Sequence, residues 1–266
     1  MRPPHEFSQK IPQKPSDIKR YLSILLFILL IYSAGKFTRF SVRDLIEGMN
    51  EGAGFLKELF FPPDWAYMRR LIDPMKETIQ ISIVGTFFGS IFAIPLAILS
   101  ARNFLQKPLI TGFFRNFLGL FRTIPSLVFA ALFASVFGLG SFPGMMALVV
   151  FTSGLVAKLG FEAIESIDPG PVEALESCGA SKLSILRYAI IPQILPQYLS
   201  FVLYSFEINI RASAVLGYVG AGGIANYYNR TLSFLQYDRA GSIVILTFVV
   251  VMALDLVSSR IRERLL

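Results

Sequence analysis

The side chains that most often perform catalysis are scarce in this sequence. His5 is the only histidine among 266 residues, so we expect neither a Ser-His-Asp triad nor a histidine metal cluster within the chain. Cys178 is the only cysteine, which excludes an intramolecular disulfide and a cysteine metal site. Gly35-Lys36 is followed by Phe37 rather than Ser or Thr, so the phosphate-binding loop of an ATPase is missing. We therefore predict no catalytic residue, no metal and no cofactor.

A polar block at residues 173–192 interrupts a mostly apolar region. Glu173-Ala174-Leu175 opens a short helix after Pro169-Gly170-Pro171, and Gly179 gives a turn because glycine tolerates positive φ. Ser181 is suited to cap a second short helix at 182–190, and Pro192 begins the next apolar segment. The block is either an ordinary connecting loop or a helix–turn–helix that binds a partner in water.

Charged residues also fall within the apolar segments. Glu207 and Arg211 are four apart on one segment, in the order that favours an intrahelical ion pair. A charge at the centre of a membrane costs about 2.5–3.5 kcal/mol, so these residues need a partner or water. They are either a structural ion pair or part of a path for an anion, in which Asn209 and Ser213 would add hydrogen bonds. Arg122 is either a second path residue or a cytoplasmic anchor.

Composition indicates an integral membrane protein. The chain is 54% hydrophobic and 16% charged, with a mean hydropathy of +0.59, whereas soluble domains carry about 25% charged residues. The net charge of +7 is spread over segment ends rather than one face, which favours membrane orientation over nucleic-acid binding.

The expected fold is all-α, with about six transmembrane helices, because about 20 apolar residues cross the hydrocarbon core. The spans are expected at residues 21–37, 78–100, 117–137, 142–161, 195–219 and 241–259. Residues 1–20 form a polar tail before the transmembrane domain, 21–266. The first apolar run has features of a signal peptide, but a retained span fits better because further spans follow. Apolar residues at helical spacing in 42–60 predict an amphipathic helix at the membrane surface.

Six spans place both termini on one side, which also collects most basic residues. By the positive-inside rule that side is cytoplasmic, and it includes the loop 162–192. The opposite loop, 36–76, also carries seven basic residues, which weakens the asymmetry.

The spacing within the polar block resembles the EAA loop of ABC-importer permeases. That loop has Glu-Ala-Ala, a Gly six positions after the Glu and a Pro thirteen after the Gly, matched here by Glu173, Ala174, Gly179 and Pro192. Leu175 and Ile191 depart from the pattern. Other segments resemble phosphonate ABC-transporter permeases, over about residues 60–266: Phe61–Trp65, Glu77–Gln80, Arg122–Pro125, Gly179-Ala180-Ser181, Pro192-Gln193, Asn209–Ser213 and Val215–Ile224.

The resemblance implies an importer permease of the bacterial inner membrane. Its loop 162–192 would dock into a cytoplasmic ATPase subunit through Glu173, Ala174, Gly179, Ala180 and Pro192. A soluble or lipid-anchored binding protein would deliver a phosphonate outside, and a second permease copy, identical or related, would complete the path.

Three alternatives remain at this point. Phosphite and hypophosphite permeases look similar to phosphonate permeases. An intramembrane enzyme lacks catalytic side chains here, and a membrane scaffold would tolerate disruption of the 173–192 spacing. The glycine-rich run 217–223 predicts close helix packing or a hinge, since no strand precedes it.

Overall fold

The computed structural model describes residues 17–38, 40–220 and 222–265, and every regular element in these ranges is a helix. The expected all-α fold is therefore confirmed. The chain divides into two units, Met1–Lys57 and Glu58–Leu266. Most of the predicted N-terminal tail, residues 1–16, lies outside the described residues.

The first unit contains α1 (Asp17–Phe37) and most of α2 (Val42–Phe60). The apolar stretch of α1 is long enough to cross a membrane, and the helix begins before the predicted residue 21. The hydroxyl of Ser41 accepts a hydrogen bond from the Asp44 amide at 3.3 Å and so caps the start of α2. The helix ends just before Phe61-Pro62, because a residue that precedes proline disfavours the helical conformation. The predicted amphipathic helix is confirmed, while its place at the membrane surface stays a prediction.

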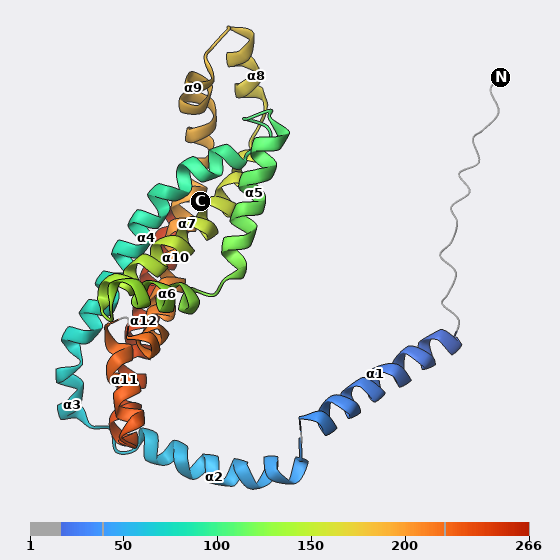
Figure 1. Cartoon of the computed structure of the whole chain (residues 1–266). Helices are drawn as coiled ribbons and strands as arrows, with labels where there is room; N and C mark the ends of the chain where they lie inside the picture. The colour runs from blue at the N-terminus through green and yellow to red at the C-terminus, as the bar shows by residue number, and fades with distance from the viewer. Residues whose placement is uncertain (1–16, 39, 221, 266) are drawn as a thin grey trace. The chain divides into compact units, whose positions relative to one another are not determined.

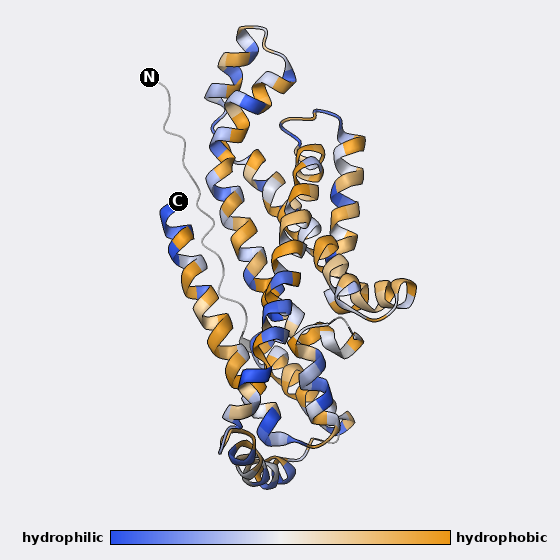
Figure 2. Cartoon of the chain, turned by 90° about the vertical axis from the view of Figure 1, so that its left-hand side faces the viewer, coloured by the Kyte–Doolittle hydropathy of each residue, from blue (hydrophilic) through white to orange (hydrophobic). Residues whose placement is uncertain are grey.

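The second unit is a helical bundle with the loop 162–192 at one end (Figure 1). Its elements are α3 (Trp65–Arg70), α4 (Ile72–Ser100), α5 (Pro108–Thr123), α6 (Ser126–Phe137), α7 (Ser141–Glu165), α8 (Gly170–Ser177), α9 (Lys182–Ile185), a π-helical turn (Leu186–Ile190), α10 (Ile191–Leu216), a 3-10 turn (Gly217–Val219), α11 (Ile224–Ser233) and α12 (Tyr237–Leu265). In the picture α8 and α9 lie at one end of this unit, and α3 and α11 lie at the other. Figure 2 shows that apolar residues follow the long helices and hydrophilic residues gather toward their ends.

Small residues bring α4 and α7 into close contact. A Cβ atom added at Gly89 would lie 2.5 Å from Thr152 Cβ, and one added at Gly85 would lie 2.7 Å from Leu148 Cβ. Membrane helices pack through such small residues, because lipid supplies no hydrophobic force between them. The α4–α7 pair is thus the centre of the bundle, and α10 packs against both helices.

The helices agree with five or six membrane spans. Among the described residues, five apolar helical stretches are long enough to cross, and α5 with α6 makes a sixth only if the bent pair counts as one span. The region of the span predicted at 117–137 is not one straight helix, because α5 and α6 meet at 86°. The break lies at Ile124-Pro125: a residue before proline prefers extended backbone, and Ile124 has ψ 120°. Pro125 itself caps α6.

The glycine-rich run after α10 is a close crossing of backbones, as predicted. A Cβ atom at Gly217 would lie 2.3 Å from the Ala225 side chain, and one at Gly223 would lie 2.4 Å from Thr78 Oγ1. The Gly220 carbonyl also accepts a hydrogen bond from the Gly140 amide at 2.8 Å. The run therefore joins α4, α7 and α11 at the end of the bundle opposite α8 and α9.

Candidate functional site

The loop 162–192 forms two short helices joined by a sharp turn. The carboxylate of Asp168 accepts a hydrogen bond from the Gly170 amide at 3.0 Å where α8 begins. Glu173 lies in the first turn of α8, where the helix dipole favours an acidic side chain, and it is exposed with its neighbour Ala174. Both residues therefore face water and are accessible to a partner.

Gly179 ends α8 in a left-handed conformation, with φ +71°. Its amide donates to the Glu176 carbonyl at 2.9 Å, and the Ala180 amide donates to the Leu175 carbonyl at 3.0 Å. These two bonds form the Schellman motif, which prefers glycine at the left-handed position. The sequence-based interpretation of Gly179 as a turn is therefore confirmed, and its bonds involve Ala180 as well.

The second half of the loop continues directly into α10. The Ser181 hydroxyl accepts a hydrogen bond from the Ser184 amide at 3.2 Å, which confirms Ser181 as a cap. The second short helix predicted at 182–190 is present as α9 and a π-helical turn, and it runs into α10 without a break. A π-helical turn at 186–190 widens the backbone just before Pro192, which has no amide hydrogen to donate.

The base of the loop is anchored while its tip is exposed. Gln193 Oε1 accepts a hydrogen bond from the Asp168 amide at 3.0 Å, and Ile185 and Ile190 are buried against Ile164. At the tip, Leu183 is 74% exposed. The tip of the loop is therefore accessible, while its base is fixed to the bundle.

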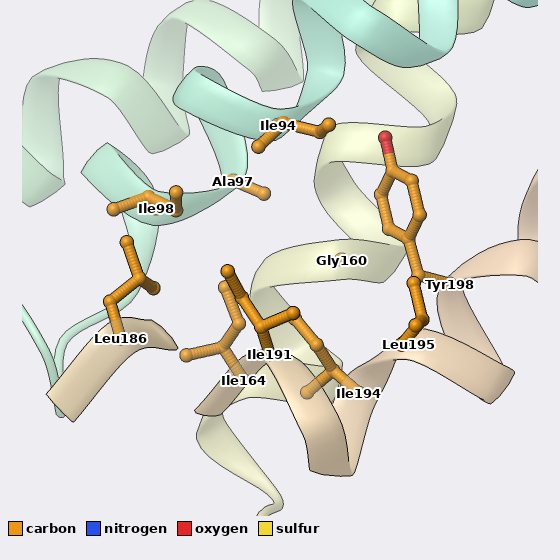
Figure 3. Close-up of a pocket in the computed structure, with 10 residues that line it drawn as sticks. All are labelled: Ile94, Ala97, Ile98, Gly160, Ile164, Leu186, Ile191, Ile194, Leu195 and Tyr198. Carbon is orange, nitrogen blue, oxygen red and sulfur yellow. The ribbon is translucent and has the colours of Figure 1, made fainter. Parts of the chain in front are cut away.

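A small apolar pocket of about 120 Å³ lies between α4, α7 and the start of α10 (Figure 3). Ile94, Leu186 and Ile191 point into it, and Tyr198 lies at its edge. The Tyr198 hydroxyl donates to the Ser90 carbonyl rather than to the cavity. The pocket offers no charged group to hold an anion, and among the described residues no group of acidic, His or Cys side chains is arranged for a metal.

Glu207 pairs with a residue that the sequence did not suggest. Its carboxylate lies 2.8 Å from Arg262 Nη2 of α12, and its side chain is 6% exposed. The predicted Glu207–Arg211 ion pair is wrong: Arg211 Nε donates to the Glu207 backbone carbonyl at 3.2 Å. Arg262 belongs to the basic C-terminal end of the chain, which is 55 residues away in sequence, so helical spacing gives no signal for this pair.

Asn209 and Ser213 connect helices. The Asn209 amide donates to Thr86 Oγ1 at 2.8 Å and to Thr152 Oγ1 at 2.7 Å, and the side chain is fully buried. Ser213 Oγ lies 3.0 Å from Ser82 Oγ. These bonds join α10 to α4 and α7, so a solute could reach Asn209 only if the helices separated. A path role for both residues stays a prediction.

Two arginines of the predicted path, Arg122 and Arg211, are exposed. Arg211 lines a hollow of about 360 Å³ between α10, α11 and α12. Arg122 is exposed near the end of α5, about 21 Å along that helix from Pro108 at 1.5 Å per residue. Arg122 thus precedes the break between α5 and α6, and both alternatives for it, a path residue or a cytoplasmic anchor, stay predictions.

The helical bundle and the exposed, glycine-capped helix pair agree with one class of membrane protein, the permease subunits of ABC importers, and the family match assigns the chain to it. Residues 93–265 match the family described as binding-protein-dependent transport system inner membrane component, and the chain belongs to that family. Members are multi-pass proteins of the inner membrane and are not themselves catalytic.

Several relatives are named for transport of phosphorus anions. The phosphite transport system permease protein PtxC of Stutzerimonas stutzeri is 36% identical over 76% of this chain and 74% of its own length. The phosphate-import permease protein PhnE of Mycolicibacterium smegmatis is 39% identical over 71% of this chain but 36% of its own. A putative cryptic phosphonate transport system permease protein, PhnE2 of Escherichia coli, is 40% identical over 45% of this chain and 98% of its own.

Solved structures support the fold. A chain of the MetNI methionine ABC transporter, in an inward facing conformation, matches with a TM-score of 0.66 at 20% identity, over 76% of this chain and 99% of that one. A bacterial ABC transporter for import of alginate gives a TM-score of 0.56 at 20% identity, over 93% of this chain and 97% of the other.

Proposed function

We propose that this permease imports a small phosphorus oxyanion, with a phosphonate as the first candidate. The observation that carries the proposal is the anchored, exposed helix pair around Gly179 in a chain whose sequence has no nucleotide-binding loop. Such a chain requires energy from another polypeptide. The names of the relatives support a phosphorus anion as cargo, and the accessible guanidinium groups of Arg122 and Arg211 support an anionic one.

The same proposal assigns partners to each face. A separate ATPase subunit docks on 162–192 in the cytoplasm, through Glu173, Ala174, Gly179 and Ala180, with Pro192 at the base. A soluble or lipid-anchored binding protein delivers the anion outside, and a second permease copy completes the path. Both termini then lie in the cytoplasm.

Phosphite or hypophosphite is the alternative cargo, favoured by the relatives whose names include phosphite. A membrane scaffold is the alternative from another class. Co-purification of an ATPase subunit that is lost when the loop is altered distinguishes a permease from a scaffold.

Uptake into proteoliposomes tests the cargo and the path. The permease, its ATPase and its binding protein are reconstituted, and ATP-dependent uptake of methylphosphonate, phosphite and phosphate is compared. Because a charged hydrogen bond contributes about 1.5–3 kcal/mol, Arg211→Gln should lower uptake by about 10-fold or more. Arg260→Gln, an exposed control at the end of α12, should leave it unchanged. Normal uptake by Arg211→Gln would remove Arg211 from the path, and no uptake of any of the three anions by the native complex would overturn the cargo.

A further inference from the structure

A second basic site lies at the end of the bundle opposite the loop 162–192. There α12 packs against α3 and α11 (Figure 1). Side chains of these helices line a pocket of about 510 Å³. Its polar lining comes mainly from three arginines and two tyrosines: Arg70, Arg230, Arg239, Tyr67 and Tyr227. With the loop in the cytoplasm, this pocket faces the extracytoplasmic side.

The charges of the pocket are not balanced by carboxylates. Arg239 is partly neutralised, since its Nε lies 3.5 Å from Asp64 Oδ2 and its Nη1 donates to Gln236 Oε1 at 2.9 Å. Within the part of the chain that the structure describes, neither Arg70 nor Arg230 forms an ion pair with an acidic side chain. Two guanidinium groups therefore face the pocket without an acidic partner.

Tyr67 lies close to the arginines of the pocket, and their charges act on its hydroxyl. The Arg239 guanidinium lies 5.2 Å from the centre of its ring, and Arg239, Arg230 and Arg70 all lower the pKa of its hydroxyl. Burial outweighs them and raises that pKa above its ordinary value of 10.0, so the hydroxyl stays protonated at neutral pH. The pocket thus combines several fixed cations with a neutral hydroxyl donor.

We propose that this pocket binds a phosphoryl oxyanion, the non-bridging phosphoryl oxygens of a phosphonate, a phosphate ester or a phospholipid headgroup. A planar guanidinium presents two parallel N–H groups that match two phosphoryl oxygens, and two guanidiniums with a phenol supply donors for all the non-bridging oxygens of such a group. The inference that the permease then transports this anion rests on the proposed function. The inference that the pocket binds it is independent of the proposed function.

Direct titration tests the site without transport. The full-length permease is placed in phosphatidylcholine nanodiscs and titrated with methylphosphonate by calorimetry. We expect saturable binding that Arg70→Gln and Arg230→Gln each weaken by about 10-fold. Arg69→Gln is the matched control, because Arg69 is exposed next to Arg70 but does not line the pocket. Binding is measured without the ATPase, so it can be detected even if the reconstituted complex shows no uptake. Failure of the proposed function and failure of this site are therefore distinguishable.

A second arm identifies a lipid source. The same variants are purified from membranes, and their bound anionic phospholipids are quantified by mass spectrometry. Loss of bound lipid from Arg70→Gln and Arg230→Gln but not from Arg69→Gln, without methylphosphonate binding, assigns the phosphoryl group to a lipid headgroup. If both pocket variants match native protein in both arms, the proposal is overturned.

Discussion

Gly179 and Glu207 represent two residue-level roles in this permease, because one sets a backbone turn and the other holds a buried charge. The sequence indicated the first role, since a glycine between two short polar helices predicts a left-handed turn. It did not indicate the partner of Glu207. Helical spacing reports neighbours three or four residues apart, whereas Arg262 reaches Glu207 only through the packing of α12 on α10.

The Glu207–Arg262 ion pair should contribute measurably to stability. Removal of one member of a buried ion pair costs about 3–5 kcal/mol, because the other charge stays buried and unpaired. We expect Arg262→Met to lower the thermal unfolding midpoint clearly, and Glu207→Gln combined with Arg262→Met to recover most of the loss. Arg43→Gln, which breaks an exposed pair at 2.8 Å, is the control and should change little. Equal effects of the Arg262 and Arg43 variants would contradict this role.

At the scale of elements, apolar length predicted α4, α7 and α12, and helical periodicity predicted α2. The bend between α5 and α6 was missed because apolar residues continue on both sides of Pro125, so only that proline marks the break. The helix that begins at Lys182 was predicted, but its continuation into α10 was missed for a different reason. Pro192 suggests a helix start, but the π-helical turn before it accommodates the proline inside one helix.

The contact between α4 and α7 should tolerate no added methyl group at Gly89. A Cβ atom there would lie 2.5 Å from Thr152 Cβ and 2.8 Å from the Val149 carbonyl oxygen, so the helices must move apart. Overpacking of this kind costs about 1–3 kcal/mol. Gly89→Ala should therefore lower the unfolding midpoint in detergent. Gly112→Ala in α5, which would meet nothing within 4 Å, should be neutral or slightly stabilising, and a similar loss in both variants would contradict the packing argument.

At the scale of the whole molecule, function depends on which side of the membrane carries the loop. Cys178 is the only cysteine of the chain and is exposed at the end of α8, so it reports topology without engineering. We expect a membrane-impermeant maleimide to label it in inverted vesicles but not in intact spheroplasts. Bound ATPase should reduce the labelling. Labelling in intact spheroplasts would show that the loop is extracytoplasmic, and it would contradict the assignment of partners to both faces.

The central claim is that the ATPase subunit docks on the loop around the turn at Gly179 and couples ATP hydrolysis to transport there. Gly179→Pro removes the amide that donates to Glu176 and cannot adopt φ +71°, whereas Gly179→Asn tolerates the left-handed conformation. The decisive measurement is ATP-dependent methylphosphonate uptake by reconstituted complexes of native protein and both variants, with insertion verified by Cys178 labelling. The account predicts near-native uptake for Gly179→Asn and loss of uptake and ATPase co-purification for Gly179→Pro. Native uptake by an inserted Gly179→Pro permease would contradict it.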